Sequence, residues 1–265
     1  MMSAPVLSFD DAVVMVTGAS KGIGFACARA FARAGATVAG VSRSQENLEA
    51  ARAALRSEGL DMCIVAANLT EEAAALEAVR RVEEEVGPVS VLVSSAGAAR
   101  LYAADQLGGE AFRQAMDAKY FSYMNVIDAV ARRMASRHRG SIVNVIGQGG
   151  KSPSPLHIPG GAANAALMLA TVGYARAYAQ LGVRFNAINP GVTRTGRVEE
   201  GAAVAAQSSG RTQEEVVAEQ LAKIPMGRMA EPDEVANVAL FLASDLASYV
   251  SGAVIPMDGC AAPFI

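Results

Sequence analysis

The stretch Thr17-Gly18-Ala19-Ser20-Lys21-Gly22-Ile23-Gly24 decides the fold, because it joins a short apolar run to a helical pattern. The run Ala12–Val16 precedes it, and the alanine-rich segment Gly22–Ala34 follows it. The first glycine permits a tight turn, the second a close approach of the backbone to a ligand, and the third close packing of helix on strand. Glycines at this spacing, at the first strand-to-helix junction, predict a phosphate-binding turn for a dinucleotide.

The same alternation of strand and helix continues along the chain. Seven nearly apolar segments predict strands: Ala12–Val16, Thr37–Val41, Met62–Ala66, Val89–Val93, Ser141–Val145, Arg184–Ile188 and Ala253–Pro256. Six helical patterns separate them: Gly22–Ala34, Gln45–Ser57, Glu71–Val86, Gly109–Ser136, Gly160–Leu181 and Asp233–Leu242. Apolar strands alternating with helices predict a single α/β domain over residues 1–265. Its core is a Rossmann-type doubly wound parallel sheet of about seven strands, with helices on both faces. Residues 193–223 break the rhythm and predict a substrate flap or short helices over a site.

Composition excludes several classes of protein. The net charge is −3, and no cluster of Lys and Arg suggests a nucleic-acid or membrane partner. The three cysteines, Cys27, Cys63 and Cys260, are widely spaced and form no CxxC pair, which favours a reducing compartment and neither a metal nor a disulfide framework. No basic region followed by an apolar run opens the chain, and no apolar stretch is long enough to span a bilayer. We therefore expect a cytoplasmic protein.

The end of the second strand indicates which dinucleotide binds. An NAD-preferring site carries Asp or Glu there for the ribose 2′-hydroxyl, whereas this chain has Val41-Ser42-Arg43-Ser44. Arg43 and Lys21 suit a 2′-phosphate, so the sequence favours NADP(H) over NAD(H). The residues expected to contact the pyrophosphate and the 2′-phosphate are Gly18, Ser20, Lys21, Gly22, Ile23, Gly24, Ser42 and Arg43.

The chain resembles the short-chain dehydrogenase/reductase family over almost its whole length. The resemblance rests on TGASKGIG at 17–24, ANLT at 67–70, SSAG at 94–97, IVNV at 142–145, RFNAINPGVTRT at 184–195, EPDEVANVALFLASD at 231–245 and VSGAVIPMDG at 250–259. It implies a seven-stranded sheet, a homodimer or homotetramer, and NAD(P)-linked oxidation or reduction of an alcohol, carbonyl or activated double bond. It also implies cofactor contacts at the adenine, ribose and nicotinamide ends from Asn68, Leu69, Ala96, Gly97, Pro190, Gly191, Val192 and Thr195.

The catalytic residues of this family do not carry over. The family uses Asn, Ser, Tyr and Lys, and the flanking motifs place Lys119, Gly147, Gly160 and Asn164 at those positions. No Tyr stands four residues before any Lys in the chain. A positioned general acid contributes roughly 10²–10⁴ in rate, and an oxyanion donor roughly 10²–10³. The resemblance therefore implies slow carbonyl reduction by the usual family mechanism.

Other groups could replace the missing ones, and three functions stay open. Lys119 could polarise a carbonyl or hold an acidic substrate group, or it could simply reach the surface. His157 and Tyr102 could donate a proton. The protein could be an atypical NADP(H)-dependent oxidoreductase acting on a carbonyl or an activated double bond. It could instead be a non-catalytic nucleotide-binding subunit or sensor, joined to an active family member through the apolar helix Ala165–Ala179. The third reading is a non-redox lyase or isomerase.

Overall fold

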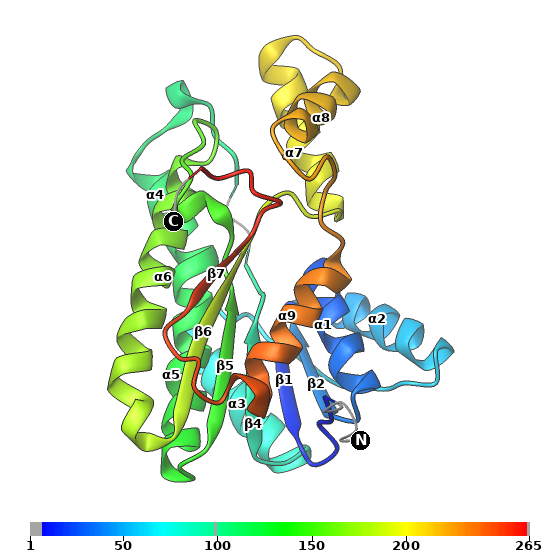
Figure 1. The fold of residues 1–265 in the computed structure, drawn as a ribbon, viewed down its shortest axis with the longest axis vertical. Coiled ribbons are helices and arrows are strands. Elements are labelled where there is room, and N and C mark those ends of the chain that lie inside the picture. Colours follow the sequence, from blue (N-terminus) through cyan, green and yellow to red (C-terminus); the bar gives the residue numbers. More distant parts are fainter. Residues whose placement is uncertain (1–6, 98–99, 264–265) are drawn as a thin grey trace, which may run out of the picture.

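A seven-stranded parallel sheet forms the centre of the protein in the computed structural model, which describes residues 7–97 and 100–263 (Figure 1). The strands are β1 (Val13–Thr17), β2 (Thr37–Ser42), β3 (Cys63–Ala66), β4 (Val89–Ser94), β5 (Gly140–Val145), β6 (Val183–Pro190) and β7 (Val254–Met257). Their order is β3-β2-β1-β4-β5-β6-β7, and every pair is parallel. The predicted sheet is confirmed, and its switch point, where such sheets bind ligands, lies between β1 and β4.

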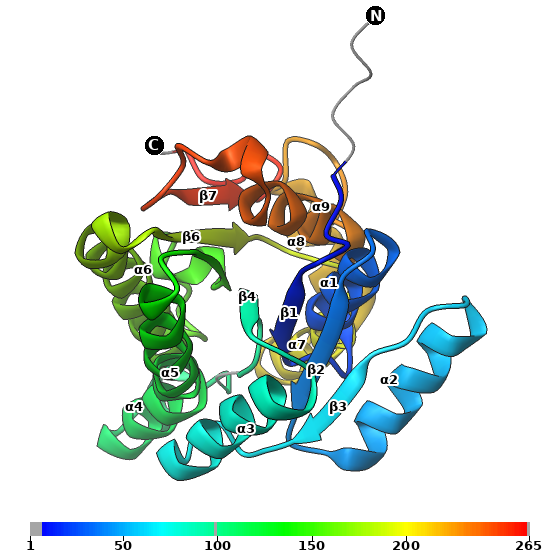
Figure 2. The same cartoon turned by 90° about the horizontal axis from the view of Figure 1, so that it is seen from below.

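Helices cover both faces of the sheet (Figure 2). One layer holds α1 (Gly22–Arg33), α2 (Gln45–Ser57) and α9 (Pro232–Ala243), and the other holds α3 (Glu72–Glu85), α5 (Ser122–Ser136) and α6 (Ile158–Tyr178). Alternate residues of β4 enter the two cores: Leu92 packs with the α3 and α5 layer, whereas Val91 and Val93 pack with the α1 and α9 layer. Burial on both faces explains why the strands are apolar throughout.

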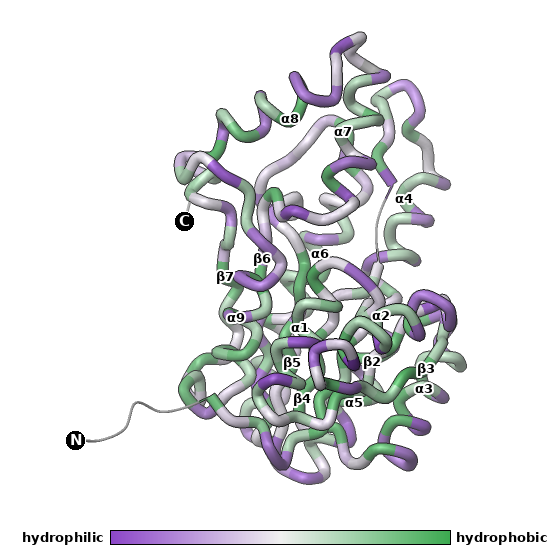
Figure 3. Tube along the Cα trace, turned by 90° about the vertical axis from the view of Figure 1, so that its right-hand side faces the viewer, coloured by the Kyte–Doolittle hydropathy of each residue, from purple (hydrophilic) through white to green (hydrophobic). Residues whose placement is uncertain are grey.

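Charged residues lie mostly on the outer surfaces of the helices and in the loops, and Lys119 is a buried exception. Figure 3 shows hydrophobic strands and hydrophilic stretches on outer helices such as α3. On α3, Arg80 forms ion pairs with Glu77 and Glu84, one turn away on either side. None of the helices within residues 7–97 and 100–263 is both long and apolar enough to cross a membrane.

The helix expected over Gly109–Ser136 is interrupted, so that expectation was wrong in part. A π-helical turn, Met116–Phe121, separates α4 (Gly109–Ala115) from α5. The Ser122 hydroxyl donates to the carbonyl oxygen of Ala118 within this turn at 2.9 Å. A Cβ on Gly97 would lie 2.1 Å from the same oxygen, so the loop after β4 packs directly on this turn.

The segment 193–223 forms two helices, α7 (Gly196–Ser209) and α8 (Gln213–Ala222), beyond the carboxyl ends of the strands (Figure 1). A parallel bridge between Thr193 and Ala230 closes the base of this excursion. The Arg194 amide donates to the Ala230 carbonyl at 2.8 Å, and the Ala230 amide donates to the Val192 carbonyl at 3.0 Å. Short helices were expected here, and their action as a substrate flap stays a prediction.

Candidate functional site

The turn between β1 and α1 is shaped by two glycines that no larger residue could replace. Gly18 adopts a φ of +71°, and a Cβ there would lie 2.7 Å from the carbonyl oxygen of Ser95. A Cβ on Gly24 would lie only 2.2 Å from the carbonyl oxygen of Gly18. The first turn of α1 therefore packs against the start of its own loop, which leaves a glycine-lined cradle at the switch point.

The amino end of α1 is open. Lys21 is the N-cap residue, yet its side chain makes no capping hydrogen bond, and the first turn contains no acidic residue. Amide groups without a cap, at the positive end of a helix dipole, favour an anion such as a pyrophosphate. The cradle and the open helix end thus fit a dinucleotide.

The remaining predicted cofactor residues lie at the same edge of the sheet. Asn68 and Leu69 follow β3, Ala96 and Gly97 follow β4, and Pro190, Gly191 and Val192 end or follow β6. Thr195 comes back to the phosphate loop, since its Cγ2 would lie 3.3 Å from a Cβ on Gly22. The Asn68 Oδ1 accepts from the Thr70 hydroxyl at 3.0 Å, so its carbonyl already serves the turn before α3. Ile23 is partly buried beside the phosphate loop, packed against the α1 and α9 core.

Two cations stand free at the end of β2 and in the phosphate loop. Arg43 and Lys21 are both exposed, and neither forms an ion pair within the described ranges. Ser20 and Ser42 join the two segments through a 3.1 Å contact between their hydroxyl oxygens. Ser44 instead caps α2 by accepting from the Asn47 amide at 3.2 Å. No carboxylate stands at the end of β2 to repel a 2′-phosphate.

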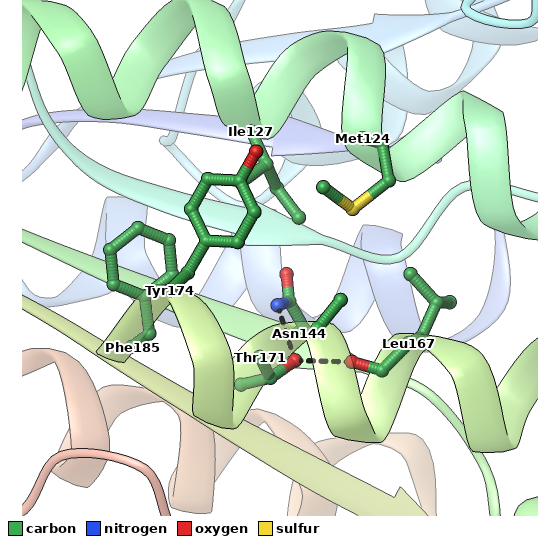
Figure 4. A pocket seen from close by; sticks show the side chains of 8 residues that line it. Met124, Ile127, Asn144, Leu167, Thr171, Tyr174 and Phe185 are labelled. Carbon is green, nitrogen blue, oxygen red and sulfur yellow. Dashed lines mark hydrogen bonds between the residues drawn. The ribbon is translucent and has the colours of Figure 1, made fainter. Parts of the chain in front are cut away.

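The positions to which the resemblance assigns catalytic residues converge after β5. Gly147 has a φ of +125°, a conformation that side chains disfavour. The Asn164 amide donates to the Gly147 carbonyl at 3.5 Å, and Gly160 lies one turn before Asn164 on α6. Deeper in the same helix, Thr171 accepts from Asn144 of β5 at 3.0 Å and donates to the Leu167 carbonyl (Figure 4). This hydrogen bond fixes the position of α6 along β5.

His157 occupies the space that a side chain at position 160 would need. A Cβ on Gly160 would lie 2.1 Å from the His157 Cε1, and a Cβ on Gly149 would lie 3.1 Å from its Cδ2. The imidazole therefore sits between two glycines, and its Nδ1 is buried without a hydrogen-bond partner in the part of the chain that is described. Burial, followed by repulsion from Arg197 and Lys119, lowers the pKa of His157 below its ordinary value.

Lys119 is buried rather than directed to the surface. It is only 8% exposed, and its Nζ donates to the Tyr123 hydroxyl at 2.9 Å and to the Val145 carbonyl at 3.3 Å. Burial, with a smaller contribution from Arg197, lowers the pKa of Lys119 to about 7. The alternative that this lysine reaches the surface was wrong.

Tyr102 uses its hydroxyl elsewhere. The group donates to Gln114 of α4 at 3.0 Å. The Tyr102 backbone amide donates to the Leu156 carbonyl at 2.9 Å, just before His157. The structure thus places Tyr102 beside the loop that carries His157, as a backbone support.

Five buried polar atoms at the ends of β4, β5 and β6 and in the loop after β5 lack a hydrogen-bond partner among the described residues: Ser94 Oγ, Asn144 Oδ1, Gln148 Oε1, His157 Nδ1 and Asn189 Oδ1. Native proteins leave few such groups, and a cluster of them indicates a place for a ligand or water. Within 7–97 and 100–263, no group of three His, Cys, Asp or Glu side chains could hold a metal ion.

Sequence reasoning missed two contributors to the site. The Thr17 hydroxyl accepts from the backbone amides of Ser95 and Ala96 at 3.1 and 3.2 Å, which ties the loop after β4 to the phosphate turn. Arg197, at the start of α7, places a positive charge near Lys119 and His157. The threonine could have been suspected from its position before Gly18, but nothing in the sequence indicates that Arg197 approaches the end of β5.

A parallel sheet of this order, with a glycine turn and an open helix end at its switch point, defines a Rossmann-type dinucleotide-binding protein. The family described as enoyl-(acyl carrier protein) reductase matches residues 18–260. Gluconate 5-dehydrogenase from Gluconobacter oxydans is 31% identical, over 97% of this chain and 98% of its own. The chain therefore belongs to the short-chain dehydrogenase/reductase family.

Solved structures agree with this assignment. A variant of actinorhodin polyketide ketoreductase with NADPH has a TM-score of 0.92 and 26% identity, covering 97% of this chain and 100% of that one. An NADPH-bound short-chain oxidoreductase from Pseudomonas aeruginosa PAO1, described as containing an atypical catalytic center, has a TM-score of 0.87 and 29% identity. It covers 97% of this chain and 99% of its own.

Proposed function

We propose that the protein is an NADP(H)-dependent oxidoreductase that acts on a carbonyl, its alcohol or an activated double bond without the Ser-Tyr-Lys set of its family. The observation that supports the proposal is the glycine cradle of the phosphate turn with its open helix end, beside the site where the family resemblance places Gly147, Gly160 and Asn164 at the positions of that set. NADPH in two similar solved structures supports the choice of cofactor.

Each part of the site has a role in this proposal. The amides at the start of α1 hold the pyrophosphate, and Arg43 with Lys21 binds the 2′-phosphate. The bound NADP(H) supplies or takes up a hydride. The chain then has to orient the substrate oxygen and to exchange one proton with it, at the edge formed by Gly147, His157 and Asn164.

Absorbance of the nicotinamide at a fixed cofactor concentration tests the function. D-gluconate with NADP⁺, and acetoacetyl-CoA or crotonyl-CoA with NADPH, probe the alcohol, carbonyl and double-bond chemistries suggested by the relatives and by the family description. Turnover of any one of them, absent with NAD(H), supports the proposal. NADPH binding without turnover of any of them contradicts it and favours a nucleotide-binding subunit.

Arg43→Ala should weaken NADPH binding by about 10- to 100-fold and leave NADH binding unchanged. The change removes one charge-assisted hydrogen bond to the 2′-phosphate, which contributes roughly 1.5–3 kcal/mol. Nucleotide fluorescence titrations measure both constants. Arg139→Ala, an exposed arginine before β5, is the matched control and should change neither. An equal loss for both nucleotides would show that Arg43 acts on the fold rather than on the phosphate.

We also propose a homodimer or homotetramer assembled through α6. Leu169 of this helix is 77% exposed, and it lies beside the exposed small residues Ala165 and Gly173. Leu169→Glu should reduce the mass measured by light scattering, whereas Leu76→Glu on the outer surface of α3 should not. A wild-type protein that runs as a monomer contradicts this assembly.

A further inference from the structure

The loop between β5 and α6 holds a histidine in a cradle made of backbone. His157 is the N-cap residue of α6, but its side chain does not cap the helix. The imidazole instead folds over Gly160 and approaches Gly149 from the other side. Both residues that contact the ring are glycines. The imidazole therefore occupies space that the side chain of a larger residue at position 149 or 160 would need.

Two hydrogen bonds restrain the backbone of His157, and a third restrains the carbonyl group of the residue before it. The amide of His157 donates to the Ser154 carbonyl at 2.9 Å, and its carbonyl accepts from the Gly161 amide at 2.7 Å. The preceding carbonyl, of Leu156, accepts from Tyr102. A side chain on so restrained a backbone loses little further freedom when it is used, which suits a group that must meet a reacting atom.

The two ring nitrogens differ in their surroundings. Nδ1 is buried and has no partner in the described part of the chain, whereas Nε2 is neither buried in this way nor hydrogen-bonded there. Gln148 Oε1, also buried and unpartnered, belongs to the same loop. The buried nitrogen of a histidine with a purely structural role normally has a hydrogen-bond partner. The lack of one at His157 Nδ1 therefore favours a ring that interacts with a bound ligand.

We propose that His157 is the proton donor and acceptor of the reaction, and that Gly149 and Gly160 exist to seat its imidazole beside the substrate oxygen. This inference rests on the proposed oxidoreductase function and deepens it. In reduction, the Nε2–H bond of the imidazolium breaks and the proton forms the O–H bond of the product, as the carbon accepts the hydride that NADPH supplies. The neutral imidazole then regains a proton from water, and oxidation of an alcohol runs the same transfer in reverse.

Burial, followed by the charges around His157, sets the direction in which pH acts. The charged groups that act on it are Arg197 from α7 and Lys119 from the π-helical turn, and Lys119 is a cation below its pKa of about 7. Because the pKa of His157 is lowered, its imidazole favours the neutral form, which can accept a proton from an alcohol. Reduction should therefore become faster as the pH falls toward that pKa, and oxidation should become slower.

His157→Gln tests the role in catalysis. We expect kcat to fall by roughly 10²–10⁴, with the low-pH limb of the profile lost and the NADPH dissociation constant unchanged. His157→Ala leaves the space between Gly149 and Gly160 empty, and imidazole added to the solution should restore part of the rate. His138→Gln, which changes the other histidine, is the matched control and should keep wild-type kinetics. Wild-type turnover in His157→Gln overturns this inference alone, whereas no turnover by the wild type overturns the proposed function as well.

A second readout needs no turnover. With the Cε1 of histidine labelled by ¹³C, the two resonances can be assigned from the two glutamine variants, and the His157 midpoint should lie below 6.5. Gly160→Ala places a methyl group 2.1 Å from that carbon, so the ring must leave and its midpoint should rise. Gly108→Ala at the start of α4, with nothing within 4 Å, should leave it unchanged. If Gly160→Ala does not change the titration midpoint of His157, the proposal that Gly149 and Gly160 hold the imidazole is wrong.

Discussion

Gly24→Ala should abolish measurable NADPH binding and lower the free energy of unfolding by roughly 1–3 kcal/mol, the usual cost of forced overpacking. The added methyl group would lie 2.2 Å from the Gly18 carbonyl oxygen and 2.6 Å from its carbon. Both atoms belong to the backbone of the phosphate turn and cannot rotate away. The helix has to move away from the turn, and its amides then no longer point at one place.

Gly108→Ala is the matched control for this change. Position 108 is the N-cap residue of α4, has an extended backbone and has no atom within 4 Å of the added methyl group. It should keep NADPH binding and lower the free energy of unfolding by at most about 1 kcal/mol, because alanine is less favourable than glycine at an N-cap. Urea unfolding and NADPH fluorescence titration separate the two effects. A folded Gly24→Ala protein with wild-type affinity would show that the contact between Gly18 and Gly24 does not shape the site.

Lys119→Met should stabilise the protein at pH 7 and below by a few kcal/mol. The side chain of Lys119 is buried, and its pKa falls from 10.5 to about 7. Lowering a pKa by one corresponds to about 1.4 kcal/mol, so the folded state bears a substantial cost for the charge. Methionine has a similar length and no charge, and the Tyr123 hydroxyl still donates to the Val145 carbonyl without it.

The sign of the pH dependence follows from the lowered pKa of Lys119. Between pH 7 and 10.5 the unfolded chain carries a proton on Lys119 that the folded chain has released. The stability of the wild type relative to Lys119→Met should therefore rise with pH across this interval, and it should be constant and lowest below it. Urea unfolding of both proteins at pH 6, 8 and 10 measures the difference, in which the titrating groups that do not interact with Lys119 cancel; His157, which does interact with it, titrates below this interval.

Lys151→Met, at an exposed lysine, serves as the control and should show no such pH-dependent difference. A variant at position 119 that is less stable than the wild type at every pH, with a constant gap, would contradict the argument. The hydrogen bonds from Nζ to Tyr123 and Val145 would then outweigh the cost of burial.

The architecture could be predicted from the sequence because each strand and helix has its own hydrophobic pattern. The apolar run of β4 indicates a strand covered on both faces, and the structure divides Val91, Leu92 and Val93 between two cores. The one interruption, at Met116–Phe121, escaped detection, since a π-helical turn adds a single residue to a turn and leaves the hydrophobic pattern nearly intact.

The sequence by itself determined the parallel sheet, the glycine turn at Thr17–Gly24 and the absence of a Tyr-x-x-x-Lys pair, because local spacing and residue type carry these features. Only the tertiary structure decided that the His157 ring rests between Gly149 and Gly160, that Lys119 is buried, and that Arg197 adds its charge to both. The physical reason is that solvent exclusion and charge proximity depend on segments far apart in the chain. The spacing of residues along one helix or strand therefore does not predict which side chains are buried or which charges lie close together.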